Sequence, residues 1–239
     1  MRNRMKKIIL TENQYEKLKH DASYYDESNT RIPKEIEFNK LGVDDELTIY
    51  FKDNVDKDTI TEFLKEFNSA RKKIENRFKL KLGRQYKDPD AQYNIFFGKN
   101  IVFDDTYNGY SSAEYIRGYA QHSPTDSFYF NLPKVKELYD MAKKDWIPNP
   151  NYKANKSRSY NINKIEDIII HEIAHALYFQ QPTSKRKQWE EYFNQEGWQN
   201  ATSFYGQEND QEMFAETIVD LINGESNQAV SDLVEIFDF

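Results

Sequence analysis

Two histidines and a glutamate lie close together in the segment His171-Glu172-Ile173-Ala174-His175. Residues four positions apart share one face of an α-helix and lie about 6 Å apart along its axis. Two imidazoles at that spacing can bind one zinc ion, and a carboxylate beside the first of them can accept a proton from a water molecule on that ion. The segment therefore predicts zinc ligands at His171 and His175 and a general base at Glu172.

Two histidines do not complete a catalytic zinc site, which generally has three protein ligands and one open position. His122, in a polar and loop-like stretch, is one candidate for the third ligand. Glu212 is the better candidate, because it lies four residues before Glu216 on a segment rich in apolar side chains, where carboxylates need a partner. Glu216 is then expected to form a hydrogen bond with a ligating histidine.

A helix that begins near Lys164 and ends before Pro182 is expected to carry both histidines. Asn163 and Glu166 have the spacing of a capping box at its start. Apolar residues recur after them near a period of 3.6 residues, so one side of this helix is predicted to face the core. The histidines lie on the neighbouring side.

A second helix is expected to present the two glutamates. Asn209 or Asp210 can cap its start, and Gly224 is expected to end it after Asn223. The two helices must pack side by side if the histidines and a glutamate are to bind the same ion.

The two motifs together resemble the gluzincins, a group of zinc metallopeptidases in which H-E-x-x-H is followed by a glutamate on a second helix. Residues 202–216 are similar, more narrowly, to the catalytic domain of anthrax lethal factor and to the Pro-Pro endopeptidases. Those proteins have a Tyr-Gly pair, a short polar segment and then Glu-aromatic-aromatic-Ala-Glu. This chain has Tyr205-Gly206 followed by Glu212-Met213-Phe214-Ala215-Glu216, with methionine where an aromatic residue is common. The resemblance covers about residues 164–223.

The resemblance implies a role for each matching residue. His171, His175 and Glu212 would be zinc ligands, Glu172 the general base, Glu216 the neighbour that supports the ligands, and Tyr205 a hydrogen-bond donor to the oxyanion. One zinc ion per chain is implied as the cofactor. In zincins an edge strand of a small sheet lies above the active-site helix and pairs with the substrate backbone. Phe128, Tyr129 and Phe130 are the candidate residues for that strand.

The remaining pattern predicts an α+β fold of the zincin type: a small mixed sheet, an active-site helix and a mostly helical C-terminal part. Residues 1–45 are expected to form a partly helical N-terminal extension, with a helix at 11–25, that packs on the domain or on a docking partner. Residues 46–239 are expected to form the metallopeptidase domain. Within it we expect strands at 47–51, 93–97, 101–103 and 127–132, helices at 58–78 and 133–144, and a loop at 145–160.

Composition limits the partners of the chain. A net charge of −7 argues against general nucleic-acid binding, which relies on a basic surface. The absence of cysteine rules out disulfides and thiolate zinc ligands. No apolar run approaches a membrane span, and the run Ile8-Ile9-Leu10 is too short for a signal peptide. The expected location is the cytoplasm or a larger assembly into which the protein is packaged, with a processed secreted form as an alternative.

The sequence therefore predicts a zinc-dependent metalloendopeptidase that hydrolyses a protein or peptide substrate. Two alternatives remain open. One is a structural or host-interaction protein on a metallopeptidase fold, such as a virion component. The other is a toxin-type protease with one dedicated substrate. The presence of Glu172 favours catalysis, because a site that only binds metal has no need of a base.

Overall fold

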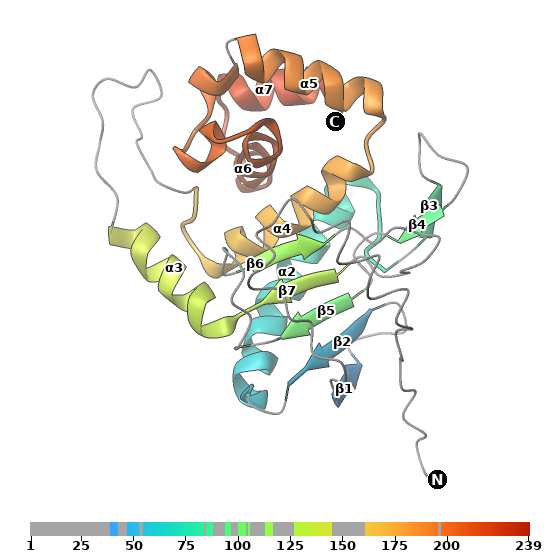
Figure 1. Cartoon of the computed structure of the whole chain (residues 1–239), viewed down its shortest axis with the longest axis vertical. Helices are drawn as coiled ribbons and strands as arrows, with labels where there is room; N and C mark the ends of the chain where they lie inside the picture. The colour runs from blue at the N-terminus through green and yellow to red at the C-terminus, as the bar shows by residue number, and fades with distance from the viewer. Residues whose placement is uncertain are drawn as a thin grey trace, which may run out of the picture.

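Five short strands form one sheet in the computed structural model of the chain, in the order β1-β2-β5-β7-β6 (Figure 1). The three inner strands are parallel, and β1 and β6 pair antiparallel at the two edges. The strands are β1 Asn39–Gly42, β2 Thr48–Phe51, β5 Asn100–Phe103, β6 Ala113–Ile116 and β7 Ser127–Phe130. Two further strands, β3 Gln85–Lys87 and β4 Asn94–Phe96, form a separate antiparallel pair.

The structure describes residues 39–42, 47–52, 55–83, 85–87, 94–96, 100–103, 105, 113–116, 127–144, 161–195 and 197–239. The predicted helix 11–25, the predicted loop 145–160 and His122 lie outside these residues. β1 is already part of the sheet, so the sheet includes four residues that precede the predicted domain boundary at 45.

The helices in these ranges are α2 Lys57–Phe78, α3 Leu132–Lys144, α4 Ile165–Phe179, α5 Thr183–Gln195, α6 Asp210–Asn223 and α7 Gln228–Phe237. Two short 3-10 helices, η1 Gly197–Asn200 and η2 Tyr205–Gln207, lie between α5 and α6. The α+β class predicted from the sequence is confirmed. None of the helices in the described ranges has the length and apolar character needed to cross a membrane.

Aromatic side chains join α2 to the middle of the sheet. Phe63 of α2 lies 5.5 Å from Phe103 and 4.8 Å from Phe130, measured between ring centroids. Phe67, one turn further along α2, packs on Phe128 and Phe130. All five rings are buried, so this core fixes the sheet against α2.

The prediction of β7 as the substrate-binding edge strand is wrong. β7 pairs with β5 on one side and β6 on the other, so its backbone groups are used within the sheet. Phe128 and Phe130 are completely buried, and Tyr129 is half-buried on the opposite face of the strand. No sequence pattern predicts the strand at 113–116, and without β6 its neighbour β7 would be the edge.

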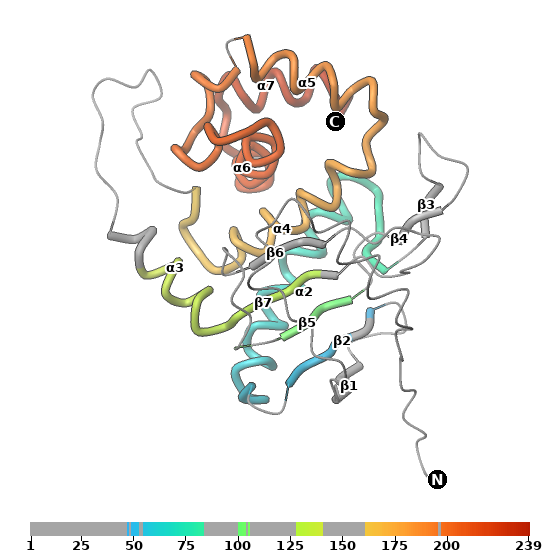
Figure 2. The backbone as a smooth tube through the Cα atoms, in the orientation of Figure 1, coloured from blue at the N-terminus to red at the C-terminus, as the bar shows by residue number. Residues whose placement is uncertain are grey.

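α4 lies at the centre of the molecule, between two groups of elements. Figure 2 shows it running between the sheet with α2 and the group formed by α5, α6 and α7, and it contacts α2, β6, α3 and α6. Almost every residue of α4 is therefore buried, and not only the one apolar side that the sequence predicts. A helix packed on all sides holds its side chains in fixed positions.

The start of α4 differs in detail from the prediction. The residue that reaches back to the chain before the helix is Asp167, whose carboxylate accepts hydrogen bonds from the amides of Asn163 (2.8 Å) and Lys164 (3.1 Å). Glu166, predicted for this role, instead forms ion pairs with Lys73 of α2 (2.7 Å) and with Lys164 (2.6 Å). The capping box predicted from Asn163 and Glu166 is therefore shifted by one residue.

Glu166→Gln is expected to destabilise the protein at neutral pH and not at pH 2. Burial alone would raise the pKa of Glu166, but hydrogen bonds from Lys164 and Lys73 outweigh it and lower the pKa to about 2. A lowered carboxyl pKa stabilises the fold above about pH 4.5, and the effect is lost as the pH falls towards 2. Both lysine side chains are about 40% exposed and regain water, so we expect a loss of about 1–2 kcal/mol.

Urea unfolding of the metal-free protein between pH 7 and pH 2 measures this difference. Glu62→Gln, at an exposed position of α2, is the matched control and is expected to unfold like wild type throughout. A Glu166→Gln penalty that stays constant down to pH 2 would show that the ion pairs are not its source.

Candidate metal centre

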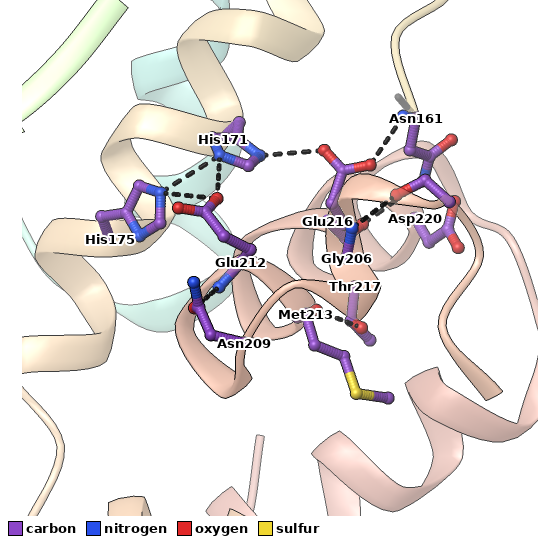
Figure 3. A network of polar contacts seen from close by, with 11 residues as sticks. Asn161, His171, His175, Gly206, Asn209, Glu212, Met213, Glu216, Thr217 and Asp220 are labelled. Atoms are coloured by element: carbon purple, nitrogen blue, oxygen red, sulfur yellow. Dashed lines mark hydrogen bonds and ion pairs between the residues drawn. The ribbon is translucent and has the colours of Figure 1, made fainter. Parts of the chain in front are cut away.

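Three potential ligand atoms from two helices converge on one point (Figure 3). The Nε2 atoms of His171 and His175, on α4, point towards this position, and so does the carboxylate of Glu212, on α6. The three separations are 3.1 Å between the two Nε2 atoms, and 3.0 Å and 3.3 Å from Glu212 Oε2 to His171 and His175. The structure therefore brings together the three residues that the sequence predicts as ligands.

These separations suit a tetrahedral ion. Ligand atoms on a zinc ion at 2.0–2.2 Å lie about 3.3–3.6 Å apart, only slightly more than the distances between these three atoms. Two imidazoles and a carboxylate also form a donor set that zinc accepts. The two Nε2 lone pairs and the carboxylate oxygen repel one another at these distances, and a cation among them, like a proton, would remove the repulsion. The residues present therefore fit a metal ion.

The other nitrogen of His171 is held by a second carboxylate of α6. Nδ1 of His171 lies 3.0 Å from Glu216 Oε1, and both side chains are buried. A proton on Nδ1 that is donated to Glu216 leaves the lone pair of Nε2 for a metal. Glu216 thus occupies the supporting position that the sequence predicts.

Glu216 is itself fixed by Asn161, a residue that no sequence pattern indicates. The backbone amide of Asn161 donates to Glu216 Oε2 at 2.6 Å, and its side-chain amide donates to the carboxylate of Asp220. Burial raises the pKa of Asp220, and the nearby charge of Glu216 adds to this effect. Asn161 lies 10 residues before His171 in the sequence, in a stretch without periodicity, so no local pattern points to it.

The carboxylates make the centre favourable for positive charge. Burial alone would lower the pKa of His171, but its hydrogen bonds to Glu212 and Glu216 outweigh it and hold the pKa well above the usual value. Burial alone would raise the pKa of Glu212, and the two histidines reverse this and lower it. Glu212 therefore stays ionised, as a carboxylate ligand must be.

Tyr205 packs near His171, and Glu172 follows His171 on α4. The ring of Tyr205 lies 5.7 Å from the ring of His171, measured between centroids. Burial raises the pKa of Tyr205, and the charges of Glu212 and Glu172 raise it further, so the phenol keeps its proton. Glu172 is buried next to His171 on α4. A hydrogen-bond donor and a carboxylate therefore accompany the ligands.

Gly206 allows η2 to lie directly on α6. A Cβ atom at Gly206 would be 3.3 Å from Ser203 Oγ and 3.5 Å from Cβ of Glu216. The amide of Gly206 donates to Ser203 Oγ at 2.9 Å. A side chain here would crowd the Ser203 hydroxyl, whereas its contact with Glu216 would be an ordinary one, and the φ of Gly206 is not in the left-handed region. The close contact holds the neighbouring Tyr205 near the ligands.

Comparisons of the chain with protein-family models, with curated proteins and with solved structures found no match. The assignment of the centre therefore depends on the residues and distances described above.

Proposed function

We propose that this chain is a zinc-dependent metallopeptidase of the gluzincin type, with one zinc ion bound by His171, His175 and Glu212. One observation carries the proposal: both histidines of an H-E-x-x-H helix and a glutamate of a second helix converge within 3.3 Å. The buried Glu172 beside them supplies a base, which a site that only binds metal does not need.

Each residue around the centre has a chemical task in this proposal. Bound zinc makes a water molecule acidic near neutral pH and polarises a carbonyl group. Glu172 accepts the proton of the attacking water and donates it to the departing amine. Tyr205 keeps its phenolic proton and donates a hydrogen bond to the oxyanion that develops on the scissile carbonyl. Glu216 and Asn161 keep His171 in the orientation that exposes Nε2.

We further propose that β6 binds the substrate backbone. β6 is an edge strand among the described strands, and it contacts α4, which carries both histidines. An extended peptide that pairs with β6 would continue the sheet and pass beside the metal centre. This proposal replaces the assignment to β7.

Cleavage of a peptide library, followed by mass spectrometry, tests the proposed function. The zinc-loaded wild type is expected to cut peptides at a restricted set of bonds, and the chelator-treated protein is expected to cut none. A preference for one short motif would favour a dedicated substrate. Zinc binding without cleavage of any peptide would contradict the proposed function and favour a binding or structural role.

Tyr205→Phe is expected to lower kcat by about 10²–10³-fold with a much smaller change in KM, because an oxyanion donor acts mainly in the transition state. Zinc content and thermal stability should change little, since the ring that packs on His171 remains. Steady-state kinetics on a cleaved library peptide measure both constants.

Tyr192→Phe is the matched control for this substitution, because its hydroxyl bonds to Asp232 of α7, away from the centre. It should cleave like wild type. A wild-type kcat in Tyr205→Phe would remove the tyrosine from the reaction and leave a generic gluzincin.

A further inference from the structure

Polar contacts join α4 and α6 at three places along their length, and the metal centre with Glu216 is the middle one. At one end Asn223 of α6 donates to Asp167 of α4 at 2.9 Å. At the other end the hydroxyl of Tyr178 donates to the carboxylate of Asp210 at 2.5 Å. The two helices are therefore antiparallel, with Asp210 and Tyr178 at the end nearest to Glu212.

Glu212 lies in the first turn of α6, the part of a helix that is held by the fewest backbone hydrogen bonds. Asn209 caps this turn and accepts from the amide of Glu212 at 2.9 Å. Asn209 is exposed, so water competes with this cap. A metal ligand needs placement to within about 0.5 Å, so the turn that carries Glu212 needs further support.

Asp210 receives that support from two buried side chains. Tyr178, three residues after His175 on α4, donates to its carboxylate, and the indole of Trp189 on α5 donates to its backbone oxygen at 2.8 Å. Tyr178 is 4% exposed and Trp189 is fully buried. Residues three apart share a helix face, so Tyr178 continues the row of side chains that α4 turns towards α6.

We propose that Tyr178 is a positioning residue of the metal centre: through Asp210 it fixes the first turn of α6 and thereby places Glu212 opposite the two histidines. Trp189 assists by holding the same residue from α5. The proposal rests on the metal centre of the proposed function and assigns no chemical step to Tyr178. It adds to the centre a contact that lies beyond the ligands and their immediate neighbours.

Zinc affinity of Tyr178→Phe, measured by competition with a chelator, tests the proposal. Residues bonded directly to a ligand typically change metal affinity by about 10–100-fold, and Tyr178 acts one residue further out, so we expect zinc binding to weaken by up to about 10-fold. The absorption spectrum of the cobalt-substituted protein should also change, because Glu212 would no longer be held at one position. Tyr192→Phe is the control, since it loses a hydroxyl-to-carboxylate bond of the same length between α5 and α7, together with the bond that Asn200 donates to the same hydroxyl. It should bind zinc like wild type.

Substitutions of Asp210 separate positioning from general loss of packing. Asp210→Asn keeps an oxygen that accepts from Tyr178 and should retain an affinity close to wild type. Asp210→Ala should bind zinc as weakly as Tyr178→Phe, and the double variant should be no weaker than either, because both remove the same contact.

In the metal-free protein, the backbone amide of Met213, which donates to the backbone oxygen of Asn209 at 3.0 Å, should exchange faster in Tyr178→Phe than in Tyr192→Phe.

Wild-type zinc affinity in Tyr178→Phe, or an equal loss in Tyr192→Phe, would overturn the proposal. A wild-type chain that binds no zinc would overturn it together with the proposed function. A wild-type chain that binds zinc but cleaves no peptide would contradict only the peptidase activity, because this test measures affinity and not turnover.

Discussion

Glu172→Gln is expected to lose peptide cleavage while it keeps its zinc. Glutamine has nearly the same shape as glutamate but cannot accept the proton of the attacking water. A general base contributes about 10²–10⁴-fold to the rate, so kcat should fall by that factor, to the limit of detection for a slow peptidase. Glu172 is not among the three residues whose ligand atoms converge, so the metal centre should persist. Steady-state kinetics and elemental analysis of the same preparation measure the two quantities.

Two outcomes would contradict the assignment of Glu172. Loss of zinc from Glu172→Gln would mean that the carboxylate is a ligand or a structural support for the ligands. Cleavage at an appreciable fraction of the wild-type rate would mean that another group accepts the proton.

Glu212→Ala is expected to lose both zinc and activity. The substitution removes one of three ligands and leaves two imidazoles, so zinc affinity should fall by more than the 10–100-fold that is typical for the loss of a supporting residue. The substitution also removes a hydrogen bond and a negative charge that raise the pKa of His171. Protons should then compete less strongly with zinc for His171, an effect that opposes the loss of the ligand and is smaller than it. Elemental analysis after dialysis against a weak chelator measures the zinc that is retained.

Glu208→Ala is the matched control for Glu212→Ala. Glu208 lies four residues earlier in the same acidic segment, but it is exposed and is not part of the converging group. It should retain one zinc ion per chain. Wild-type zinc content in Glu212→Ala would remove Glu212 from the centre, and equal losses in both variants would point to a general effect of negative charge.

Local patterns in the sequence predicted the two helices of the centre closely. The structure places α4 at Ile165–Phe179 and α6 at Asp210–Asn223, and Asn209 and Gly224 cap α6 as expected. These features depend on residues within a few positions of each other, so local sequence patterns are enough to predict them. The pairing of the two helices was predicted only because one metal ion needs ligands from both.

Features that depend on distant parts of the chain were not predicted. The edge strand β6 is a short segment whose place in the sheet is set by its pairing with β7. Asn161 meets Glu216 across 55 residues, and Tyr178 meets Asp210 across 32. Glu166 was assigned to a cap because of its spacing from Asn163, whereas a lysine from α2 pairs with it in the fold. In each case the partner lies on another element, and no periodicity within a short window records such a contact.

Titration of the metal-free protein with zinc, with binding and peptide cleavage followed in the same sample, tests the proposed metallopeptidase most directly. Binding is expected to saturate at one zinc ion per chain. The cleavage rate should rise in proportion to the zinc bound and level off at the same point. Binding that does not saturate at one equivalent would contradict the metal centre. Full binding without cleavage, or cleavage that does not depend on zinc, would contradict the proposed reaction.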